Sequence, residues 1–133
     1  MSDFYKKISI KSFTRDTGSL YFIEQSNDVP FDIKRIFYIT DINGERANHA
    51  HYKCKQFLVA INGSFDVELF HQSEHKVITL DNPNLGLLVN PLTWVKISNF
   101  KNNPICLVLA SHFYEESDYI NDFQKFISLK HEK

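Results

Sequence analysis

Two histidines separated by a single residue, His49 and His51, have the types and the spacing for acid–base chemistry in this 133-residue chain. In an extended strand, side chains two residues apart project to the same face, so we expect the two imidazoles to lie side by side. An imidazole with an unperturbed pKa of about 6.5 accepts and donates protons near neutral pH. The pair therefore predicts a pocket in which two neighbouring atoms of one substrate exchange protons. For either residue alone, a hydrogen-bonded core histidine is the alternative.

The residues that follow this pair extend the pattern. Four residues separate His51 from Gln56, and six separate Gln56 from Gly63. This order resembles the first motif of the cupin superfamily, in which a His-x-His pair precedes a glutamate and then a glycine. Cupins are small antiparallel β-barrels of the jelly-roll type, so the resemblance implies that fold. Gln56 stands where metal-binding cupins place their glutamate ligand.

The second cupin motif, a glycine, a proline and a third metal-binding histidine, is matched only in part. Gly86 and Pro91 are present, and Lys96 stands at the histidine position. A lysine ammonium has no lone pair for a metal at neutral pH, and the amide of Gln56 is a poorer ligand than a carboxylate. Two imidazoles alone do not make a typical divalent-metal site. We therefore expect a pocket that keeps its imidazoles and uses neither a metal nor another cofactor.

Short runs rich in β-branched and aromatic residues recur along the chain between turn-forming residues. They predict strands at 8–13, 20–24, 33–40, 56–61, 64–70, 76–80, 85–89, 93–97 and 105–110. Asn62-Gly63, between two of these runs, favours a type I′ turn and hence a tight hairpin. Many short strands with no helix between them favour an antiparallel sandwich or barrel. We therefore expect an all-β, cupin-type jelly-roll barrel over about residues 5–112.

The C-terminal part alone has a helical pattern, at about residues 117–130. Apolar residues at positions 119, 120, 123, 126 and 127 fall on one helical stripe. Ser117 can cap the N-terminus of this helix, and Asp118 in the first turn suits the helix dipole. Such a helix would cover the barrel mouth or one sheet face. The whole chain, residues 1–133, is expected to be one domain.

The composition argues against several classes of partner. Lys and Arg together number 15 and Asp and Glu 16, a net charge of −1, so there is no general basic field for a nucleic acid or an anionic membrane. We find no apolar run that would serve as a signal peptide or cross a bilayer. Cys54 and Cys106 are too few for a disulfide framework and are expected to be reduced, buried thiols. These features suit a cytoplasmic protein.

A closer resemblance covers most of the chain, from about residue 13 to residue 126. The segments at 34–38, 46–51, 109–111 and 114–120 are similar to those of the sugar 3,4-ketoisomerases, which act on dTDP-4-dehydro-6-deoxyglucose. The R-x-x-H-x-H block and the D-Y-I tail are the most specific parts of the match. Members of that family are metal-independent cupins and usually homodimers. They feed pathways to 3-amino-3,6-dideoxyhexoses of bacterial surface glycans. The resemblance implies the same partner here, a dTDP-linked 4-keto-6-deoxyhexose.

A 3,4-ketoisomerase moves a carbonyl from C4 to C3 of the hexose through an enediolate. The reaction needs a base, a proton shuttle and a donor that stabilises the enediolate charge. We expect His49 to be the base and His51 its acid or shuttle partner, an order that same-face geometry alone does not fix. Tyr38 is the candidate donor if its side chain points inward, and a packed aromatic is the alternative.

The nucleotide end of such a substrate needs cations and a flat surface. Arg46 can hold a diphosphate oxygen through its planar fork of donors, or lie near the sugar. The resemblance makes Arg35 a second candidate, with a solvated arginine at a strand edge as the alternative. Trp94 either stacks on the base or fills the barrel. The other histidines have no partner spacing and are expected to be surface or structural residues: His71, His75, His112 and His131.

Two positions depart from the family pattern. Thr17 interrupts the usual Asp-x-Arg-Gly-like turn, and Val95 replaces the polar residue that commonly follows the tryptophan. Both leave open whether the product is galacto- or gluco-configured at C4. Three other functions stay as alternatives: a metal-dependent cupin enzyme, a dTDP-sugar 3,5-epimerase, and a cupin that binds a sugar without reacting.

Overall fold

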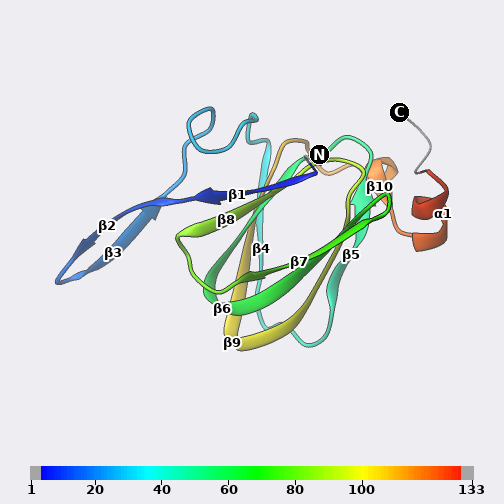
Figure 1. Ribbon diagram of the computed structural model, residues 1–133. Helices are drawn as coiled ribbons and strands as arrows, with labels where there is room; N and C mark the ends of the chain where they lie inside the picture. Colours follow the sequence, from blue (N-terminus) through cyan, green and yellow to red (C-terminus); the bar gives the residue numbers. More distant parts are fainter. Residues whose placement is uncertain (1–3, 130–133) are drawn as a thin grey trace.

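The computed structural model of the protein describes residues 4–129, which form a β-rich fold with a short helix near the C-terminal end (Figure 1). The strands are β1 (Tyr5–Ser9), β2 (Lys11–Arg15), β3 (Gly18–Phe22), β4 (Arg35–Ile39), β5 (Arg46–His51), β6 (Gln56–His71), β7 (Glu74–Leu80), β8 (Leu85–Val89), β9 (Trp94–Ala110) and β10 (Tyr119–Ile120). A 3₁₀ turn, η1 (Glu116–Asp118), precedes β10, and helix α1 (Phe123–Ser128) follows it. The strands pair antiparallel, as the sequence predicts.

The two longest strands, β6 and β9, pair with each other over most of their length and hold the fold together. The start of β6 pairs with β8 and its end pairs with β7. In the same way, the start of β9 pairs with β5 and its end pairs with β4. Each long strand therefore belongs to two sheets, one ordered β1-β8-β6-β9-β4 and the other β7-β6-β9-β5-β10. The sheets curl around a common interior (Figure 1), which confirms the expected jelly-roll architecture.

The tight hairpin predicted at Asn62-Gly63 is wrong, because β6 continues through this position. Gly63 does have the positive φ of such a turn, 66°, but it lies where the register between β6 and β9 shifts. A Cβ atom at Gly63 would collide with the backbone carbonyl oxygens of Lys101 and Asn102. The tight reversal lies ten residues later, near Gln72, between β6 and β7.

Strand β9 is also longer than predicted, because the expected strands 93–97 and 105–110 are joined into one. Asn102 and Asn103 adopt the positive φ angles typical of turns, 61° and 55°, but they do so inside the strand. These residues and Gly63 lie where the two long strands pass from one sheet to the other. The turn-forming residues therefore bend a continuous strand pair instead of ending it.

The C-terminal helix is shorter than the predicted range 117–130, the last residue of which lies outside the described residues. Helix α1 covers Phe123–Ser128, and its N-cap is Asp122, whose side chain accepts two backbone hydrogen bonds of the first turn. Ser117 lies in η1 and does not cap the helix. Tyr119-Ile120, which belong to the predicted helical stripe, form β10 instead, because pairing with β5 satisfies their backbone groups.

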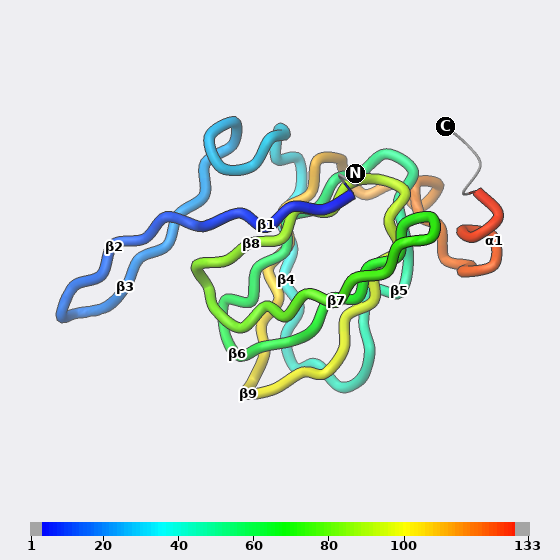
Figure 2. Tube along the Cα trace, viewed as in Figure 1, coloured from blue at the N-terminus to red at the C-terminus, as the bar shows by residue number. Residues whose placement is uncertain are grey.

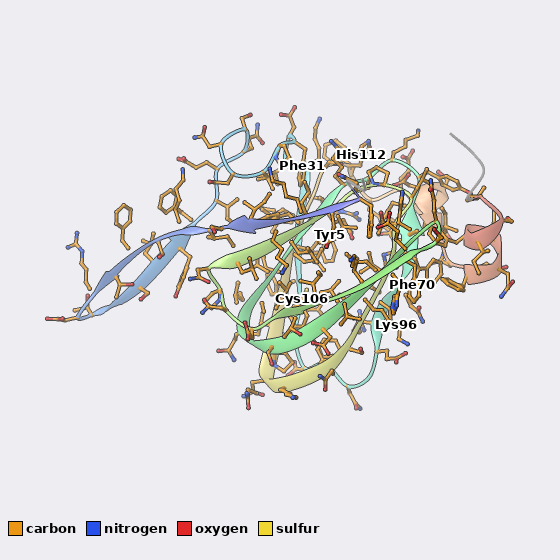
Figure 3. All side chains as sticks on the ribbon, viewed as in Figure 1. Tyr5, Phe31, Phe70, Lys96, Cys106 and His112 are labelled. Atoms are coloured by element: carbon orange, nitrogen blue, oxygen red, sulfur yellow. The ribbon has the colours of Figure 1, made fainter. Side chains whose placement is uncertain are left out.

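Apolar side chains fill the space between the two sheets, with Cys106 near the centre (Figure 3). The largest fully buried ones there are Phe65, Leu58, Leu69, Leu80 and Leu87, whereas Phe57 is buried in a second apolar cluster with Ile10 and Val29. Cys54 and Cys106 are both free and buried, which confirms the prediction for the thiols. Burial raises the pKa of Cys106 to about 12, so this thiol stays protonated and unreactive. Within residues 4–129, no helix is long and apolar enough to cross a membrane.

Strands β2 and β3 form a two-stranded ribbon that projects away from the two sheets (Figures 1 and 2). Every side chain of β2 is exposed, and the ribbon presents Phe13 at 65% and Leu20 at 58% exposure. A lone two-stranded ribbon is at best marginally stable in water. A partner that covered these apolar residues would therefore stabilise the ribbon.

We expect Gly63→Ala to lower the free energy of unfolding by more than about 2 kcal/mol, because it adds a backbone collision to the strain of a positive φ. Gly44→Ala is the matched control, since Gly44 also has a positive φ, 114°, but open space around it. The control is expected to cost about 1 kcal/mol. Urea unfolding of both variants measures the difference, and equal losses would contradict the packing role of Gly63.

Candidate active site

Strand β5 carries both histidines of the predicted pair. A β-bulge precedes them, where Ala47 and Asn48 take up positive φ angles of 70° and 55° and the register with β9 shifts. Such bulges re-aim the side chains that follow. The rings of His49 and His51 lie at right angles with their centroids 5.0 Å apart, so the prediction that they share a face is confirmed.

A cavity of about 420 Å³ opens beside His49. It is lined by Phe37, Ile39, Glu45, Arg46, Ala47, Asn48, His49, Gln56, Leu58, Val95, Ile97, Val108 and Tyr119. The lining residues come from β4, β5, β6, β9 and β10. The wall is apolar on the side of β6 and β9 apart from the amide of Gln56, and it carries the polar and charged groups on the side of β5. This cavity is the candidate active site.

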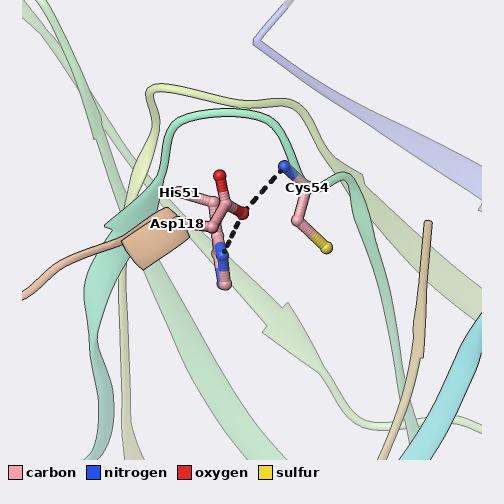
Figure 4. A group of neighbouring side chains, drawn as sticks. All are labelled: His51, Cys54 and Asp118. Carbon is pink, nitrogen blue, oxygen red and sulfur yellow. Dashed lines mark hydrogen bonds and ion pairs between the residues drawn. The ribbon is translucent and has the colours of Figure 1, made fainter. Parts of the chain in front are cut away.

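His51 lies behind this wall and does not line the cavity. Its side chain is only 5% exposed, and its Nδ1 lies 3.1 Å from Oδ2 of Asp118 (Figure 4). Its ring packs against those of His49 and Tyr119, at centroid distances of 5.0 and 4.3 Å. Its other nitrogen, Nε2, is buried without a hydrogen-bond partner among residues 4–129. The hydrogen bond to Asp118 thus fixes Nδ1 of His51, whereas Nε2 can still accept a hydrogen bond or a proton.

Burial is the main cause of the altered protonation of both imidazoles. Burial first, and then the neighbouring His51 and the cation of Arg35, together lower the pKa of His49 to about 4, against a hydrogen bond at the backbone of Ala47 that raises it. Burial also lowers the pKa of His51, and it outweighs the hydrogen bond and charge of Asp118, which act in the opposite direction. Both imidazoles are therefore neutral at pH 7, the form in which a histidine can accept a proton.

The two arginines predicted to bind substrate occupy different environments. Arg46 is exposed at the cavity edge, and no carboxylate of the described residues forms an ion pair with it. Arg35 does not line the cavity: its guanidinium lies over the rings of Phe37 and Tyr114 and donates a hydrogen bond to the Tyr119 hydroxyl at 3.5 Å. Arg46 can thus meet a ligand directly, whereas Arg35 places a positive charge behind the imidazoles.

Two further candidates lie away from the cavity. Tyr38 is 68% exposed on the outer face of β4, so the condition under which it would serve as a donor is not met. Trp94 is buried beneath α1 with Phe123 and Phe126, and its Nε1 donates to Oδ1 of Asn48 at 3.1 Å. Alternation along β9 explains this position, because Val95 faces the cavity and its neighbours face the opposite side. Trp94 therefore packs the fold, which corrects its assignment as a substrate-binding residue.

Because of the same alternation, Lys96 does not line the cavity, although it stands at the histidine position of the second cupin motif. Its ammonium points away from the cavity and pairs with Glu45 and Glu68, at 3.3 and 3.8 Å. Val95 is the residue that stands opposite His49 in the β5–β9 pairing, so the cavity presents an apolar side chain there. Of the two positions that depart from the family pattern, Val95 therefore lines the cavity, whereas Thr17 lies at the turn of the projecting ribbon.

The donor atoms around the histidines do not favour a metal ion. At the cavity wall, Val95 stands opposite His49 and offers no ligand atom, and Gln56 offers only an amide. The carboxylate of Glu45, which also lines the cavity, is paired with the ammonium of Lys96. Deeper in, His51, Cys54 and Asp118 place ligand atoms within 4.8 Å of one another. These atoms are already used: the Asp118 carboxylate accepts the backbone N–H of Cys54 (Figure 4). The thiol of Cys54 donates to the carbonyl of Lys55. A hydrogen-bonded cluster accounts for all three side chains.

Sequence reasoning missed two residues of the site, Asp118 and Tyr119. The helix predicted at 117–130 includes both residues, with Asp118 in its first turn and Tyr119 on its apolar stripe. Pairing of β10 with β5 instead sets Tyr119 opposite His51 and brings the carboxylate of Asp118 onto its imidazole. The D-Y-I tail was the available signal, since it belongs to the part of the sequence that resembles a known family.

The other histidines have structural contacts, as predicted for those that are described. His71 stacks on Phe4, and its Nδ1 lies 3.0 Å from the carbonyl oxygen of Leu92. His75 contacts the carboxylate of Glu68, and His112 contacts the hydroxyl of Ser111. His131 lies outside the described residues.

Comparisons with known proteins found similar chains of known activity. A family model described as FdtA, WxcM-like, C-terminal, matches residues 4–131. The curated TDP-4-oxo-6-deoxy-α-D-glucose-3,4-oxoisomerase of Aneurinibacillus thermoaerophilus is 42% identical over 123 residues, which cover 91% of this chain and 88% of that protein.

Solved structures of ketoisomerases superpose over nearly the whole chain. A histidine-to-asparagine variant of the 3,4-ketoisomerase QdtA from Thermoanaerobacterium thermosaccharolyticum, in complex with TDP-4-keto-6-deoxyglucose, has a TM-score of 0.95 at 36% identity and covers 100% of this chain and 98% of its own. The TDP-quinovose 3,4-ketoisomerase WlaRB from Campylobacter jejuni has a TM-score of 0.88 at 33% identity, with coverages of 93% and 97%.

We expect the ring of His49 to titrate near pH 4, well below the value of an unburied histidine, because burial and its neighbours disfavour the charged form. In His51→Asn, the pKa of His49 is expected to rise, since one of these neighbours is removed. Nitrogen-15 NMR of the histidine rings across pH 3.5–8, in the wild type and in His51→Asn, measures both values. Titration of His49 near 6.5 would refute the assigned environment.

Proposed function

Because the chain belongs to the WxcM-like family of sugar 3,4-ketoisomerases, we propose that it converts TDP-4-keto-6-deoxyglucose into a TDP-3-keto-6-deoxyhexose. The observation that carries the proposal is a pair of adjacent imidazoles with lowered pKa values, one of which, His49, lines a cavity while the other, His51, lies directly behind it. Neutral imidazoles are the groups that a stepwise proton transfer between two carbons and two oxygens requires.

His49 is the base in this proposal, because it lines the cavity whereas His51 lies behind it. It removes the C3 hydrogen as a proton, and the electron pair forms a C3–C4 double bond while the C4 oxygen takes the negative charge. His51 moves the proton of the C3 hydroxyl to the C4 oxygen. The proton on His49 exchanges with solvent, and His49 then protonates C4 as the C3–O double bond forms. C3 is oxidised and C4 reduced within one molecule, so no external electron carrier takes part.

The charge of the enediolate needs fixed donors and cations near the imidazoles. Tyr119 replaces Tyr38 as the candidate phenol, since it lines the cavity and its hydroxyl accepts a hydrogen bond from Arg35. Arg46 at the cavity edge is the candidate for the diphosphate, which a guanidinium fork can hold through two oxygens. Val95 on the cavity wall is positioned to affect which face of C4 receives the proton.

The product suggests where the enzyme acts. A ketone at C3 of a sugar nucleotide is the substrate that an aminotransferase needs to install a 3-amino group. We therefore propose a role in making a 3-amino-3,6-dideoxyhexose for bacterial surface glycans, in the cytoplasm, where nucleotide-activated sugars are assembled.

We expect His49→Asn to lower kcat by about 10²–10⁴-fold while the protein stays folded, because the base is lost and little packing is changed. His75→Asn, at an exposed histidine, is the matched control and should keep full activity. Proton NMR with TDP-4-keto-6-deoxyglucose in D₂O follows the reaction, and deuterium at C4 of a 3-keto product is expected.

Each alternative predicts a different result in the same experiment. A 3,5-epimerase would place deuterium at C3 and C5, and a sugar-binding cupin would bind the substrate without turnover. A metal-dependent enzyme would contain stoichiometric iron, manganese or zinc after purification without chelator. Unchanged activity of His49→Asn would overturn the assignment of the base.

We also propose that the chain forms a homodimer through the β2–β3 ribbon. The ribbon carries exposed Phe13 and Leu20 with no packing partner among the two sheets of its own chain. Among residues 4–129, the outer edge of β4 has no strand paired to it, and Ile36 and Tyr38 are 60% and 68% exposed there. A second copy that covers these surfaces would remove both an open strand edge and an exposed apolar ribbon.

The combined variant Phe13→Ser and Leu20→Ser is therefore expected to shift the protein from dimer to monomer. Val77→Ser is the control, because Val77 is 54% exposed on β7, away from the ribbon. Sedimentation equilibrium of the three proteins gives the masses. A dimer that survives the ribbon substitutions, or a wild-type monomer, would show that the ribbon has another role.

A further inference from the structure

We propose that Asp118 is a positioning residue for the reaction, and that it holds His51 in the tautomer with a proton on Nδ1 and a bare Nε2. The inference rests on the proposed ketoisomerase function and adds to it a residue from the other end of the chain. It concerns how His51 is prepared, since Asp118 is separated from the cavity by His51 and Tyr119.

The carboxylate of Asp118 is held by backbone groups that do not depend on His51. The N–H of Lys53 donates to Oδ1 at 2.8 Å, and the N–H of Cys54 donates to Oδ2 at 3.2 Å (Figure 4). Its side chain is only 6% exposed. Because the segment after β5 wraps around the carboxylate, Oδ2 has a fixed place and direction when it meets the imidazole.

An ionised carboxylate can only accept hydrogen bonds, so Nδ1 of His51, 3.1 Å from Oδ2, must be the donor. A neutral imidazole with its proton on Nδ1 has a lone pair on Nε2. This Nε2 is buried and has no hydrogen-bond partner among residues 4–129. The rings packed against His51 are those of His49 and Tyr119, both of which line the cavity. The free lone pair therefore lies next to the cavity wall.

The charges around His51 support a positioning role. Arg35 and His112 both disfavour its charged form, and Asp118 alone favours it. Asp118 can therefore stabilise the imidazolium that forms when Nε2 takes the C3 hydroxyl proton, before that proton passes to the C4 oxygen. Without the carboxylate, a buried imidazolium would face a guanidinium and a second histidine with no counter-charge.

The pairing of β10 with β5 places the carboxylate of Asp118 beside His51. Tyr119 pairs with His51 and Ile120 with Ala50, and the backbone N–H of Tyr52 donates to the carbonyl of Asp118 at 3.0 Å. A short strand near the C-terminal end of the chain thus fixes both the carboxylate behind His51 and the phenol beside it. The segment is part of the site and not only a cover for the fold.

We expect Asp118→Asn to lower kcat at least about 10²-fold while KM changes by less than about threefold, because an amide can donate to Nδ1 and favour the wrong tautomer. Asp122→Asn is the matched control: Asp122 also accepts two backbone hydrogen bonds, in α1, but contacts no histidine. Its kcat should stay at the wild-type value. Equal kcat values for Asp118→Asn and wild type would overturn the proposal.

The double variant separates positioning from folding. If Asp118 acts through His51, Asp118→Asn should cost less than about threefold in kcat when added to His51→Asn, whereas an independent structural role would give the full loss again. Additive losses would contradict the proposal.

Nitrogen-15 NMR of the wild-type protein without substrate gives a readout that needs no variant to fold and no activity. We expect a protonated Nδ1 and an unprotonated Nε2 for His51 at pH 7, and the opposite tautomer would overturn the proposal. If His51 shows the expected tautomer but the protein does not isomerise TDP-4-keto-6-deoxyglucose, the proposed function fails and the role of Asp118 in orienting His51 stands.

Discussion

The desolvation of two adjacent imidazoles is the physical constraint on which this site depends. Water would stabilise the charged form of each ring, and burial removes that stabilisation. Each ring is also a potential like charge for the other, and Arg35 adds a permanent positive charge to both. Of the two rings, only that of His51 forms a hydrogen bond with the buried carboxylate of Asp118. The two rings are therefore alike in chemistry but differ in environment, which is how proteins divide acid and base roles between similar groups.

The architecture produces this environment through two long strands. Because β6 and β9 pass from one sheet to the other, a single strand pair encloses the cavity on one side and supplies its apolar wall. Strand β5 lies against β9, and its bulge at Ala47 and Asn48 sets the direction of His49. Strand β10 lies against the other edge of β5 and completes the surroundings of His51. The imidazole pair is thus held between strands that are far apart in the sequence.

Much of this could be predicted from the sequence, for identifiable reasons. The side-chain alternation of a strand predicted that His49 and His51 share a face, and short β-branched runs predicted an antiparallel fold. Asn62-Gly63 shows the limit of local reasoning: the positive φ of Gly63 is real, but whether it ends a strand or bends one depends on β9, more than thirty residues away.

The site shows the same limit. Asp118 and Tyr119 fit an amphipathic helix by spacing, and only pairing with β5 makes them strand neighbours of His51. Trp94, Val95 and Lys96 are consecutive, so the side that each faces depends on a register that sequence spacing does not fix; one residue of error exchanges the cavity wall for the outer surface. Tyr38 is a similar case, because the register of β4 decides which of its residues face outward, and Tyr38 is one of them.

Val95 and Gln56, the uncharged neighbours of His49 on the cavity wall, help to keep its pKa low. A carboxylate at either position would give His49 a counter-charge and raise its pKa towards the range where it is protonated, so it could no longer act as a base at neutral pH. A neutral amide and an isopropyl group leave the imidazole uncharged and keep the wall poorly solvated. Arg35, which lies behind the rings and away from the solvent-exposed edge where Arg46 stands, acts on an anionic ligand more strongly than it would in water. Val95 and Gln56, which give His49 neither a carboxylate nor a third imidazole as a neighbour, therefore also keep His49 neutral.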